Sequence, residues 1–287
     1  MSPAPSKSTH ALKPHFEDVQ SHYDLSDDFF RLFLDPTRTY SCAYFERDDL
    51  TLEEAQLAKI DLSLGKLGLQ PGMTLLDVGC GWGATMRRAV ERYDVNVVGL
   101  TLSRNQQAYA ERAFAETPSD RSRRVLLAGW EQFTEPVDRI VSIGAFEHFG
   151  SDRWKPFFDF AFDRLPDDGL MMLHSIMQIP RGQIEERGLP ITMRHLRFFK
   201  FILEEIFPGG RLPTVPRVEK LAENGDKIIF SCNLAVEHIG QRRDCKNGER
   251  DYVMIRELNK HKREINGREE HSYERQFIGQ IQLLHFN

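Results

Sequence analysis

A glycine-rich turn between a predicted strand and a predicted helix is the feature that most constrains how this chain can fold. The apolar run from Met73 to Val78 predicts a buried strand; Gly79, Gly81 and Gly83 follow, and a helical pattern begins at Ala84. Glycine tolerates positive φ and has no Cβ, so the backbone can pass close to a ligand that faces the free N–H groups of the new helix. The stretch predicts either a ligand-binding loop or a tight strand-to-helix turn without a ligand.

The spacing of these glycines distinguishes between two classes of nucleotide cofactor. A dinucleotide-binding fold has the pattern G-x-G-x-x-G and an acidic residue ~20 positions later that holds the ribose. Here the pattern is G-x-G-x-G, and the next predicted strand, Asn96 to Leu100, ends in Thr101. Asp77 stands just before the turn, where a carboxylate can meet an ammonium group. The pattern disfavours an NAD-dependent oxidoreductase and resembles the cofactor loop of S-adenosylmethionine-dependent methyltransferases of the doubly wound class.

Composition favours an ordinary globular protein. The 287 residues are 40% hydrophobic and 28% charged, which suits one large α/β domain with a sizeable core. The formal charge of −5 gives no support for a nucleic-acid partner. No apolar run approaches the ~18 residues of a transmembrane segment and no signal pattern opens the chain, so we expect a cytoplasmic location. The four cysteines form no C-x-x-C pair, and we predict no metal site.

Predicted strands alternate with helices at a regular rhythm through the middle of the chain. After the first two strands, further strands are expected at 125–127, 138–143 and 170–176, which predicts a doubly wound, mostly parallel sheet covered by helices on both faces. We expect a disordered tail over 1–14 and a single domain over 15–287. Within it we distinguish an N-terminal helical lid (15–70), a cofactor-binding core (71–180), substrate-side helices (181–225) and an atypical C-terminal part (226–287).

Two helical segments on either side of the core are unusually apolar. Residues 15–34 carry many aromatic side chains and are compatible with a hairpin packed on the domain or with a lid over an apolar pocket. Thr51 and Glu54 form a capping box that opens a helix expected to reach Gly68. Met193 to Phe207, after the fifth strand, is too apolar for an exposed helix, and we expect it to wall an acyl tunnel or to be buried in the core.

Several long motifs in order resemble the mycobacterial cyclopropane mycolic acid synthases, from about His15 to Asn224. The resemblance implies a class I methyltransferase fold and an S-adenosylmethionine-dependent enzyme of lipid biosynthesis. The segments that carry it are 23–30 (YDLSDDFF), 39–49 (TYSCAYFERDD), 75–83 (LLDVGCGWG), 98–103 (VGLTLS), 139–149 (RIVSIGAFEHF) and 205–210 (EIFPGG).

That resemblance also implies roles for individual residues. The positions that match the family's cofactor contacts are Tyr40, Ser41, Gly79, Gly81, Thr101, Leu102, Gln106, Trp130 and Glu131, beside Asp77. Those that match its bicarbonate pocket are Cys42, Ile143 through its backbone, Glu147 and His174. On the residues alone, the core is the favoured interpretation for both Trp130, as a packed indole, and His174, as a hydrogen-bonded histidine at a strand end; the resemblance reverses that preference for His174.

The chemistry implied is transfer of a methyl(ene) group from S-adenosylmethionine to a cis double bond of a long-chain acyl substrate. Aromatic faces can stabilise the resulting carbocation, and the candidates are Tyr23, Phe30, Tyr40 and Phe146. Bicarbonate then serves as the base that removes a proton so that the ring closes. The acyl chain is expected on an acidic carrier protein, for which Arg121, Arg123 and Arg124, or Arg194 and Arg197, are either docking charges or a solvated basic face.

The family pattern stops at about Asp226. Strands are still expected at Lys227 to Val236 and Phe277 to Phe286, but charged residues dominate 241–276. The tyrosine that completes the family's bicarbonate pocket has no counterpart, because neither Tyr252 nor Tyr273 sits in a matching context. A relative that binds the cofactor without catalysis therefore stays open beside the enzyme, as do relatives that form a methyl branch or a hydroxyl.

Overall fold

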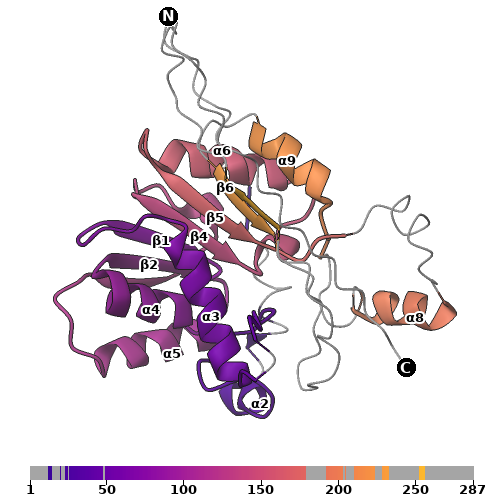
Figure 1. Cartoon of the computed structure of the whole chain (residues 1–287), viewed down its shortest axis with the longest axis horizontal. Coiled ribbons are helices and arrows are strands. Elements are labelled where there is room, and N and C mark those ends of the chain that lie inside the picture. Colours follow the sequence, from indigo (N-terminus) through magenta and orange to yellow (C-terminus); the bar gives the residue numbers. More distant parts are fainter. Residues whose placement is uncertain are drawn as a thin grey trace, which may run out of the picture.

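A seven-stranded sheet forms the centre of the molecule in the computed structural model (Figure 1). The structure describes residues 12–14, 20, 23–24, 26–47, 49–178, 192–202, 204, 210–223, 228–232 and 252–255. The strand order is β3-β2-β1-β4-β5-β6-β7. The strands are β1 (Thr74–Val78), β2 (Asn96–Thr101), β3 (Arg123–Leu127), β4 (Arg139–Ile143), β5 (Leu170–His174), β6 (Ile228–Cys232) and β7 (Tyr252–Ile255).

All neighbouring strands from β3 to β6 are parallel, and only β7 runs antiparallel to its neighbour. The central strand β1 pairs with β2 on one side, where Leu76 faces Val98, and with β4 on the other, where Leu76 faces Ile140. Continuous apolar runs suit strands that are buried on both faces of a parallel sheet. The predicted doubly wound fold is confirmed, and the order reverses between β1 and β4, where open sheets of this class bind ligands.

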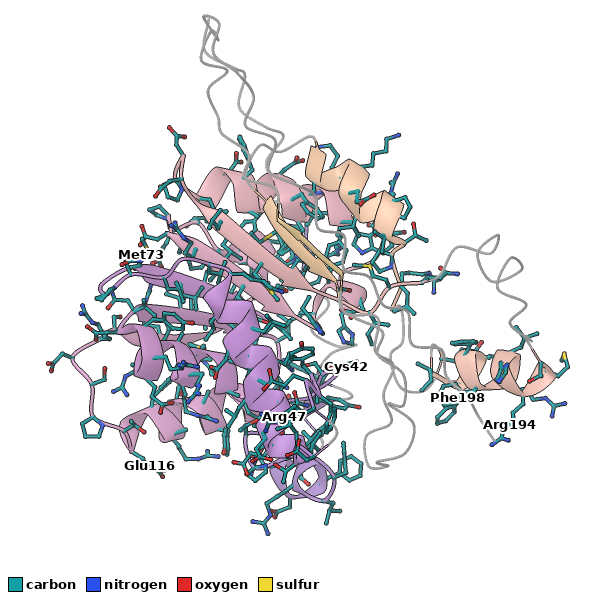
Figure 2. The ribbon with its side chains drawn as sticks, in the orientation of Figure 1. Cys42, Arg47, Met73, Glu116, Arg194 and Phe198 are labelled. Atoms are coloured by element: carbon teal, nitrogen blue, oxygen red, sulfur yellow. The ribbon has the colours of Figure 1, made fainter. Side chains whose placement is uncertain are left out.

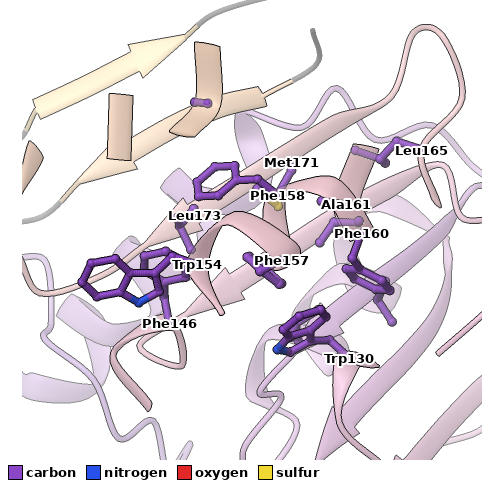
Figure 3. Close-up of a cluster of buried hydrophobic side chains, with 14 of the residues drawn as sticks. Trp130, Phe146, Trp154, Phe157, Phe158, Phe160, Ala161, Leu165, Met171 and Leu173 are labelled. Atoms are coloured by element: carbon purple, nitrogen blue, oxygen red, sulfur yellow. The ribbon is translucent and has the colours of Figure 1, made fainter. Parts of the chain in front are cut away.

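Helices cover both faces of the sheet. On one face α3 (Leu52–Gly65), α4 (Ala84–Tyr93) and α5 (Arg104–Ala115) pack on a core that includes Leu75 and Val97. On the other face α6 (Trp154–Arg164) and α9 (Val215–Glu223) pack on a core that includes Leu76 and Val98 (Figures 1 and 3). Successive strand residues point to opposite faces, so adjacent residues of β1 and β2 enter different cores.

Helix starts follow the capping signals in the sequence. At α3 the Glu54 backbone N–H donates to Thr51 Oγ1 at 3.2 Å, and the Thr51 N–H donates to the Glu54 carboxylate at 2.7 Å. This capping box confirms the predicted start, although the helix ends at Gly65 rather than Gly68. The short helix α2 (Asp27–Arg31) is capped by Ser26. Most of the expected segment 15–25 lies outside the described residues, as does the tail over 1–11.

The structure corrects three expectations about the second half. The exposed fractions of the apolar side chains of α8 (Met193–Phe201) range from 37% to 66%, so this helix is not buried (Figure 2). The edge strand β7 falls inside the charged segment 241–276, where none was expected, while 277–286 lies outside the described residues. The basic stretch 121–124 is partly strand, because β3 begins at Arg123. Within the described residues, no helix is long and apolar enough to cross a membrane.

Candidate active site

One cavity opens at the carboxyl ends of β1, β2, β3 and β4 and encloses about 1060 Å³ including its open mouth. Parallel strands of an open sheet place their ligand sites at this edge. The sequence spreads the ten predicted cofactor residues over some ninety positions, but the fold brings them all to this cavity. The residues concerned are Tyr40, Ser41, Asp77, Gly79, Gly81, Thr101, Leu102, Gln106, Trp130 and Glu131.

The glycine loop forms the floor of the cavity where β1 turns into α4. Gly79 and Gly81 have φ of +82° and +53°, a region that L-residues with a Cβ rarely adopt. A Cβ on Gly79 would lie 2.4 Å from the Cβ of Ala145, so the loop packs tightly against the β4 end. A Cβ on Gly81 would meet nothing within 4 Å, so at this position the backbone is bare towards the cavity. A flat ligand can therefore approach the backbone at Gly81.

Asp77 is the last polar residue of β1 and is 2% exposed. Its Oδ2 has no hydrogen-bond partner among the described residues. Burial raises the pKa of its carboxyl to about 7, and the nearby Lys59 charge opposes that shift. A cationic ligand group such as an amino-acid ammonium would supply the missing partner and favour the carboxylate. The residue fits the expected contact with the amino group of S-adenosylmethionine.

The β2 end forms the neighbouring wall. Thr101 Oγ1 donates to the Gln106 side chain at 2.7 Å, which fixes both cavity residues. Ser103 caps α5 and also donates from Oγ to Asp24 at 2.5 Å, while Gln20 donates to the Leu102 carbonyl at 2.9 Å. The described part of the N-terminal segment therefore lies against the loop that the sequence places at the ribose.

Trp130 and Glu131 lie on the third side, in the 3-10 helix η2 (Trp130–Gln132). The Trp130 indole packs on Phe157 and Phe160 at ring-centroid distances of 5.5 Å (Figure 3), yet it also lines the cavity. The tryptophan is therefore a core residue that also borders the cavity, and its contact with an adenine ring stays a prediction. Glu131 accepts from Arg153 Nη1 at 2.6 Å in a buried ion pair that fixes its carboxylate.

Three of the four aromatic candidates come together above the cavity. The Tyr23 ring lies 6.2 Å from Phe30 and 5.9 Å from Tyr40, and both tyrosines line the cavity. Phe146 instead packs in the core against Trp154, at 5.6 Å, on the α6 face of the sheet. The fold therefore presents two tyrosine rings to the cavity, with the buried Phe30 packed against both, whereas Phe146 belongs to the core.

The four residues assigned to bicarbonate come from separate elements. Ile143 and His174 are paired across β4 and β5, and Glu147 lies in η3 (Phe146–His148), which follows β4. Glu147 Oε1 accepts from the Ile176 N–H at 2.5 Å, which ties η3 to the segment after β5. Cys42 is a half-buried cysteine on the strip that precedes α3. Of these four, Ile143 lines the cavity itself.

Unsatisfied polar atoms mark this corner as suited to a small polar molecule. Among the described residues neither ring nitrogen of His174 has a hydrogen-bond partner, nor does Glu147 Oε2. Burial lowers the pKa of His174 to about 3, helped by the Lys59 and Lys66 charges, and burial raises the pKa of Glu147. A neutral imidazole can donate one hydrogen bond and accept another. These groups fit bicarbonate, which both donates and accepts.

Sequence reasoning missed two residues at or behind the cavity wall, His148 and Lys59. Tyr23 Oη lies 3.3 Å from His148 Nε2, and burial raises the pKa of Tyr23 with smaller contributions from Tyr40 and Glu147. Lys59 is 1% exposed, although it is a lysine in a helix. The available signal was its position: Gln56, Lys59 and Ser63 recur with Ile60 and Leu64 on the buried stripe of α3.

The basic stretch 121–124 has partners within the molecule. Arg121 pairs with Asp94 and Arg124 with Glu135, while the Arg123 guanidinium lies 5.4 Å over the Phe114 ring. These contacts favour the interpretation of residues 121–124 as a solvated basic face over their interpretation as docking charges for a carrier protein. No cluster of three or more metal-ligating side chains occurs among the described residues.

Comparisons with known proteins agree with this geometry. A sequence model described as mycolic acid cyclopropane synthetase matches residues 10–240. Cyclopropane mycolic acid synthase 1 of Mycobacterium tuberculosis is 70% identical over 211 residues, 74% of each chain. The solved structure of the cyclopropane synthase MmaA2 from the same organism is 68% identical with a TM-score of 0.73, covering 74% of this chain and 75% of that one. CmaA1 complexed with SAH and CTAB is 69% identical with a TM-score of 0.72, covering 75% of each chain.

Proposed function

Because this chain belongs to the mycolic acid cyclopropane synthetase family, a group of S-adenosylmethionine-dependent enzymes with the class I methyltransferase fold, we propose that it forms cyclopropane rings on lipid chains. The substrate is a cis double bond in a long-chain, mycolic-type acyl group. The observation that carries the proposal is the convergence of all ten predicted cofactor residues on one cavity. The crystal complex of the relative CmaA1 with SAH, the demethylated cofactor, supports the same ligand class.

The residues of the cavity divide the work of holding the cofactor. Asp77 takes the amino group, the bare backbone at Gly81 admits the methionyl part, and Thr101 with Gln106 takes the ribose. Trp130 offers a flat apolar face to the adenine, and Glu131 is fixed beside it by Arg153. When bound, S-adenosylmethionine supplies an electrophilic methyl group carried on a positively charged sulfur.

The acyl side of the site must be dry and must tolerate positive charge. Tyr23 and Tyr40 provide aromatic rings at the cavity, with the buried Phe30 packed against both, and the tyrosine ring faces stabilise a carbocation on the acyl chain by cation–π attraction. CTAB, bound in the CmaA1 structure, combines a long alkyl chain with a quaternary ammonium, and thus resembles a cationic acyl chain. These aromatic residues exclude water and orient the double bond.

Ring closure requires removal of one proton from the newly attached methyl group. Bicarbonate held by Glu147, His174 and Cys42 supplies that base. His174 stays neutral at physiological pH, because burial lowers its pKa, and it can donate to an anion without competing for the proton. Glu147, whose Oε1 accepts from the Ile176 N–H, orients the bicarbonate ion from the other side. The unpartnered atoms of Glu147 and His174 support this assignment.

A second candidate function is cofactor binding without catalysis. The absence of a counterpart to the family's bicarbonate tyrosine favours it. The Glu147 charge contributes to the raised pKa of Tyr23, so the two side chains lie near each other. A tyrosine hydroxyl near Glu147 favours the active enzyme. Relatives that leave a methyl branch or add a hydroxyl differ from the ring-forming enzyme only in the fate of the carbocation.

The remaining expectations concern the setting. We propose that the acyl substrate arrives on an acidic carrier protein and that the reaction takes place in the cytoplasm. Arg121 and Arg124 pair with acidic side chains of this protein, and Arg194 and Arg197 on the exposed helix α8 are the other candidate docking charges.

Labelled cofactor tests the reaction directly. The protein is incubated with S-adenosylmethionine that carries a trideuterated methyl group and with a cis-unsaturated long-chain lipid extract, and products are examined by mass spectrometry. Ring formation adds one carbon with two deuterium atoms and no oxygen, because the third deuterium leaves as the proton. Retention of three deuterium atoms indicates a methyl branch, or a hydroxyl when oxygen is gained. No transfer by protein that binds SAH supports the non-catalytic alternative.

A further inference from the structure

A buried lysine supports the cavity wall without lining the cavity. Lys59 lies in the middle of α3 and is 1% exposed. Its Nζ donates to Ser41 Oγ at 2.6 Å and to Gln56 Oε1 at 2.8 Å. Ser41 lines the cavity, whereas Lys59 and Gln56 do not. The lysine is therefore one hydrogen bond removed from the bound cofactor.

Gln56 completes the same support. Its amide group donates to the Ser41 carbonyl at 2.8 Å and to the Thr39 carbonyl at 3.2 Å. With one side chain oxygen bound to Lys59 and its nitrogen bound to two carbonyls, Gln56 can adopt only one orientation. Together the two side chains fasten the strip from Thr39 to Ser41 to α3 by three hydrogen bonds, and the bond between Lys59 and Gln56 holds the two supporting side chains together.

Placing a lysine here is unfavourable for folding alone. An ammonium group loses its hydration when it is buried, and burial lowers the pKa of Lys59 to about 7 against the opposing charges of Cys42, Asp35 and Asp77. A methionine of similar length would fill the space without that penalty. A costly group that is held in one geometry and directed at a ligand-contacting hydroxyl indicates a role in function.

We propose that Lys59 is a positioning residue for cofactor binding: held by Gln56, its amino group fixes the Ser41 hydroxyl and so keeps Tyr40 and Ser41 at the cavity wall. This inference rests on the proposed function, because it assumes that the cavity takes S-adenosylmethionine. Lys59 acts through Ser41 and touches neither the cofactor nor the reacting atoms.

A double-mutant cycle tests the route through Ser41. SAH affinity is measured by calorimetry for the full chain and for Lys59→Met, Ser41→Ala and the double variant. Each single substitution is expected to weaken SAH binding about fivefold to tenfold, the value of one ordinary hydrogen bond. The double variant is expected to bind no worse than the weaker single variant, because both substitutions remove the same interaction.

Two outcomes overturn the inference: Lys59→Met with affinity within about twofold of the natural protein, or losses that multiply in the double variant, as independent structural defects do. Ser63→Ala is the matched control, since Ser63 is buried on the same helix face but its hydroxyl donates only to the Lys59 carbonyl. It should leave SAH affinity unchanged. Lys59→Arg retains a donor and should recover part of the affinity.

Folding and the broader proposal are kept separate from this test. The melting temperature of Lys59→Met is expected to equal or exceed that of the natural protein; if the variant does not fold, the cycle is run with Gln56→Leu, which removes the same support from the other side. Failure of the natural protein to bind SAH contradicts the proposed function itself. Normal binding by the natural protein with no coupling between positions 59 and 41 contradicts only the role of Lys59.

Discussion

Three buried titratable side chains in or near the cavity have pKa values that burial shifts in favour of their neutral forms. The Asp77 carboxyl rises to about 7, the Lys59 ammonium falls to about 7 and the His174 imidazole falls to about 3. In each case desolvation on burial disfavours the charged form of the side chain. A ligand with a positive sulfur and an ammonium shifts Asp77 back to its carboxylate.

The raised pKa of Asp77 predicts a pH dependence of the unfolding free energy that can be measured. Its folded-state pKa of about 7 lies above the ordinary value of 3.8, so its favourable contribution is complete below pH 3.8 and is lost as the pH rises through 7. Asp77→Asn removes this contribution. Between about pH 5 and about pH 8 the unfolding free energy of the variant is expected to gain roughly 2 kcal/mol on that of the natural protein. Denaturant titrations measure both, and parallel pH curves would count against a buried, shifted Asp77.

A single substitution can separate the contribution of Glu147 to catalysis from cofactor binding. Glu147→Gln keeps an acceptor for the Ile176 N–H but removes the carboxylate beside the bicarbonate pocket. Product formation is expected to fall at least about a hundredfold, the effect of losing part of an acid–base device. SAH affinity, measured by calorimetry, should stay within about twofold because Glu147 lies outside the cofactor cavity.

The control for this prediction is Glu135→Gln, the same chemical change at an exposed glutamate paired with Arg124. It should leave both product formation and SAH affinity unchanged. Full activity of Glu147→Gln would show that the carboxylate takes no part in proton removal.

At the level of single residues, the sequence predicted positions with a local signature and missed those with only a tertiary one. Their spacing within one short stretch was enough to predict Gly79, Gly81 and Asp77 as site residues. The Lys59–Ser41 contact and the Arg153–Glu131 ion pair join residues whose side chains look solvent-exposed in any local pattern. Only the folded chain shows that each is buried and directed at a cavity residue.

Among the elements, two connecting segments offer a matched pair of glycines: Gly81 in the loop after β1 and Gly68 in the turn between α3 and β1. Gly81 and Gly68 have φ of +53° and +56°, and a Cβ on either meets nothing within 4 Å. Alanine at either position is expected to cost about 1 kcal/mol of unfolding free energy through backbone strain alone. Only Gly81→Ala places its methyl group at the cavity, so only this variant should lose SAH affinity, by about tenfold or more.

Chemical denaturation and calorimetry on the two glycine variants decide the point. Equal losses of stability with unequal losses of affinity support a loop whose bare backbone faces the ligand. Retained affinity in Gly81→Ala contradicts it.

The helix α8 carries a prediction about the acyl substrate. Leu196 and Phe199 are 50% and 45% exposed, so replacing both by glutamine should change the unfolding free energy by less than about 0.5 kcal/mol. If α8 meets the acyl chain or its carrier, turnover of a long-chain substrate falls several-fold while SAH affinity is unchanged. Leu32→Gln, at a leucine that is 81% exposed near α2, is the matched control. Unchanged turnover in the double glutamine variant removes α8 from the substrate side.

The same contrast between local and tertiary signals explains which elements were predicted. The five strands from β1 to β5 are short apolar runs bounded by turns, and each was found within a few residues. The capping box of α3 was also read correctly, because its two residues are three apart. The strand β7 was missed because it lies inside a highly charged segment. It is recognised as a strand by its pairing with β6, which only the folded chain shows. The exposure of α8 could not be foreseen, since apolar composition does not say what covers a helix.

For the molecule as a whole, the cofactor cavity and the unusual C-terminal part lie at different places on the sheet. The cavity is built at the ends of β1, β2, β3 and β4, while β6 and β7 occupy the opposite edge beyond β5 (Figure 1). Cofactor binding therefore depends on residues within the stretch that resembles the relatives. Catalysis additionally depends on the corner between β4 and β5, which lies nearer to the divergent part.

Every chemical step proposed above requires that this cavity binds S-adenosylmethionine. Calorimetric titration of the folded protein with SAH tests this binding most directly. The geometry predicts saturable binding at one site, with a dissociation constant in roughly the micromolar range. No detectable binding by protein whose circular dichroism shows the α/β fold would contradict the assignment of the cavity and every chemical step built upon it.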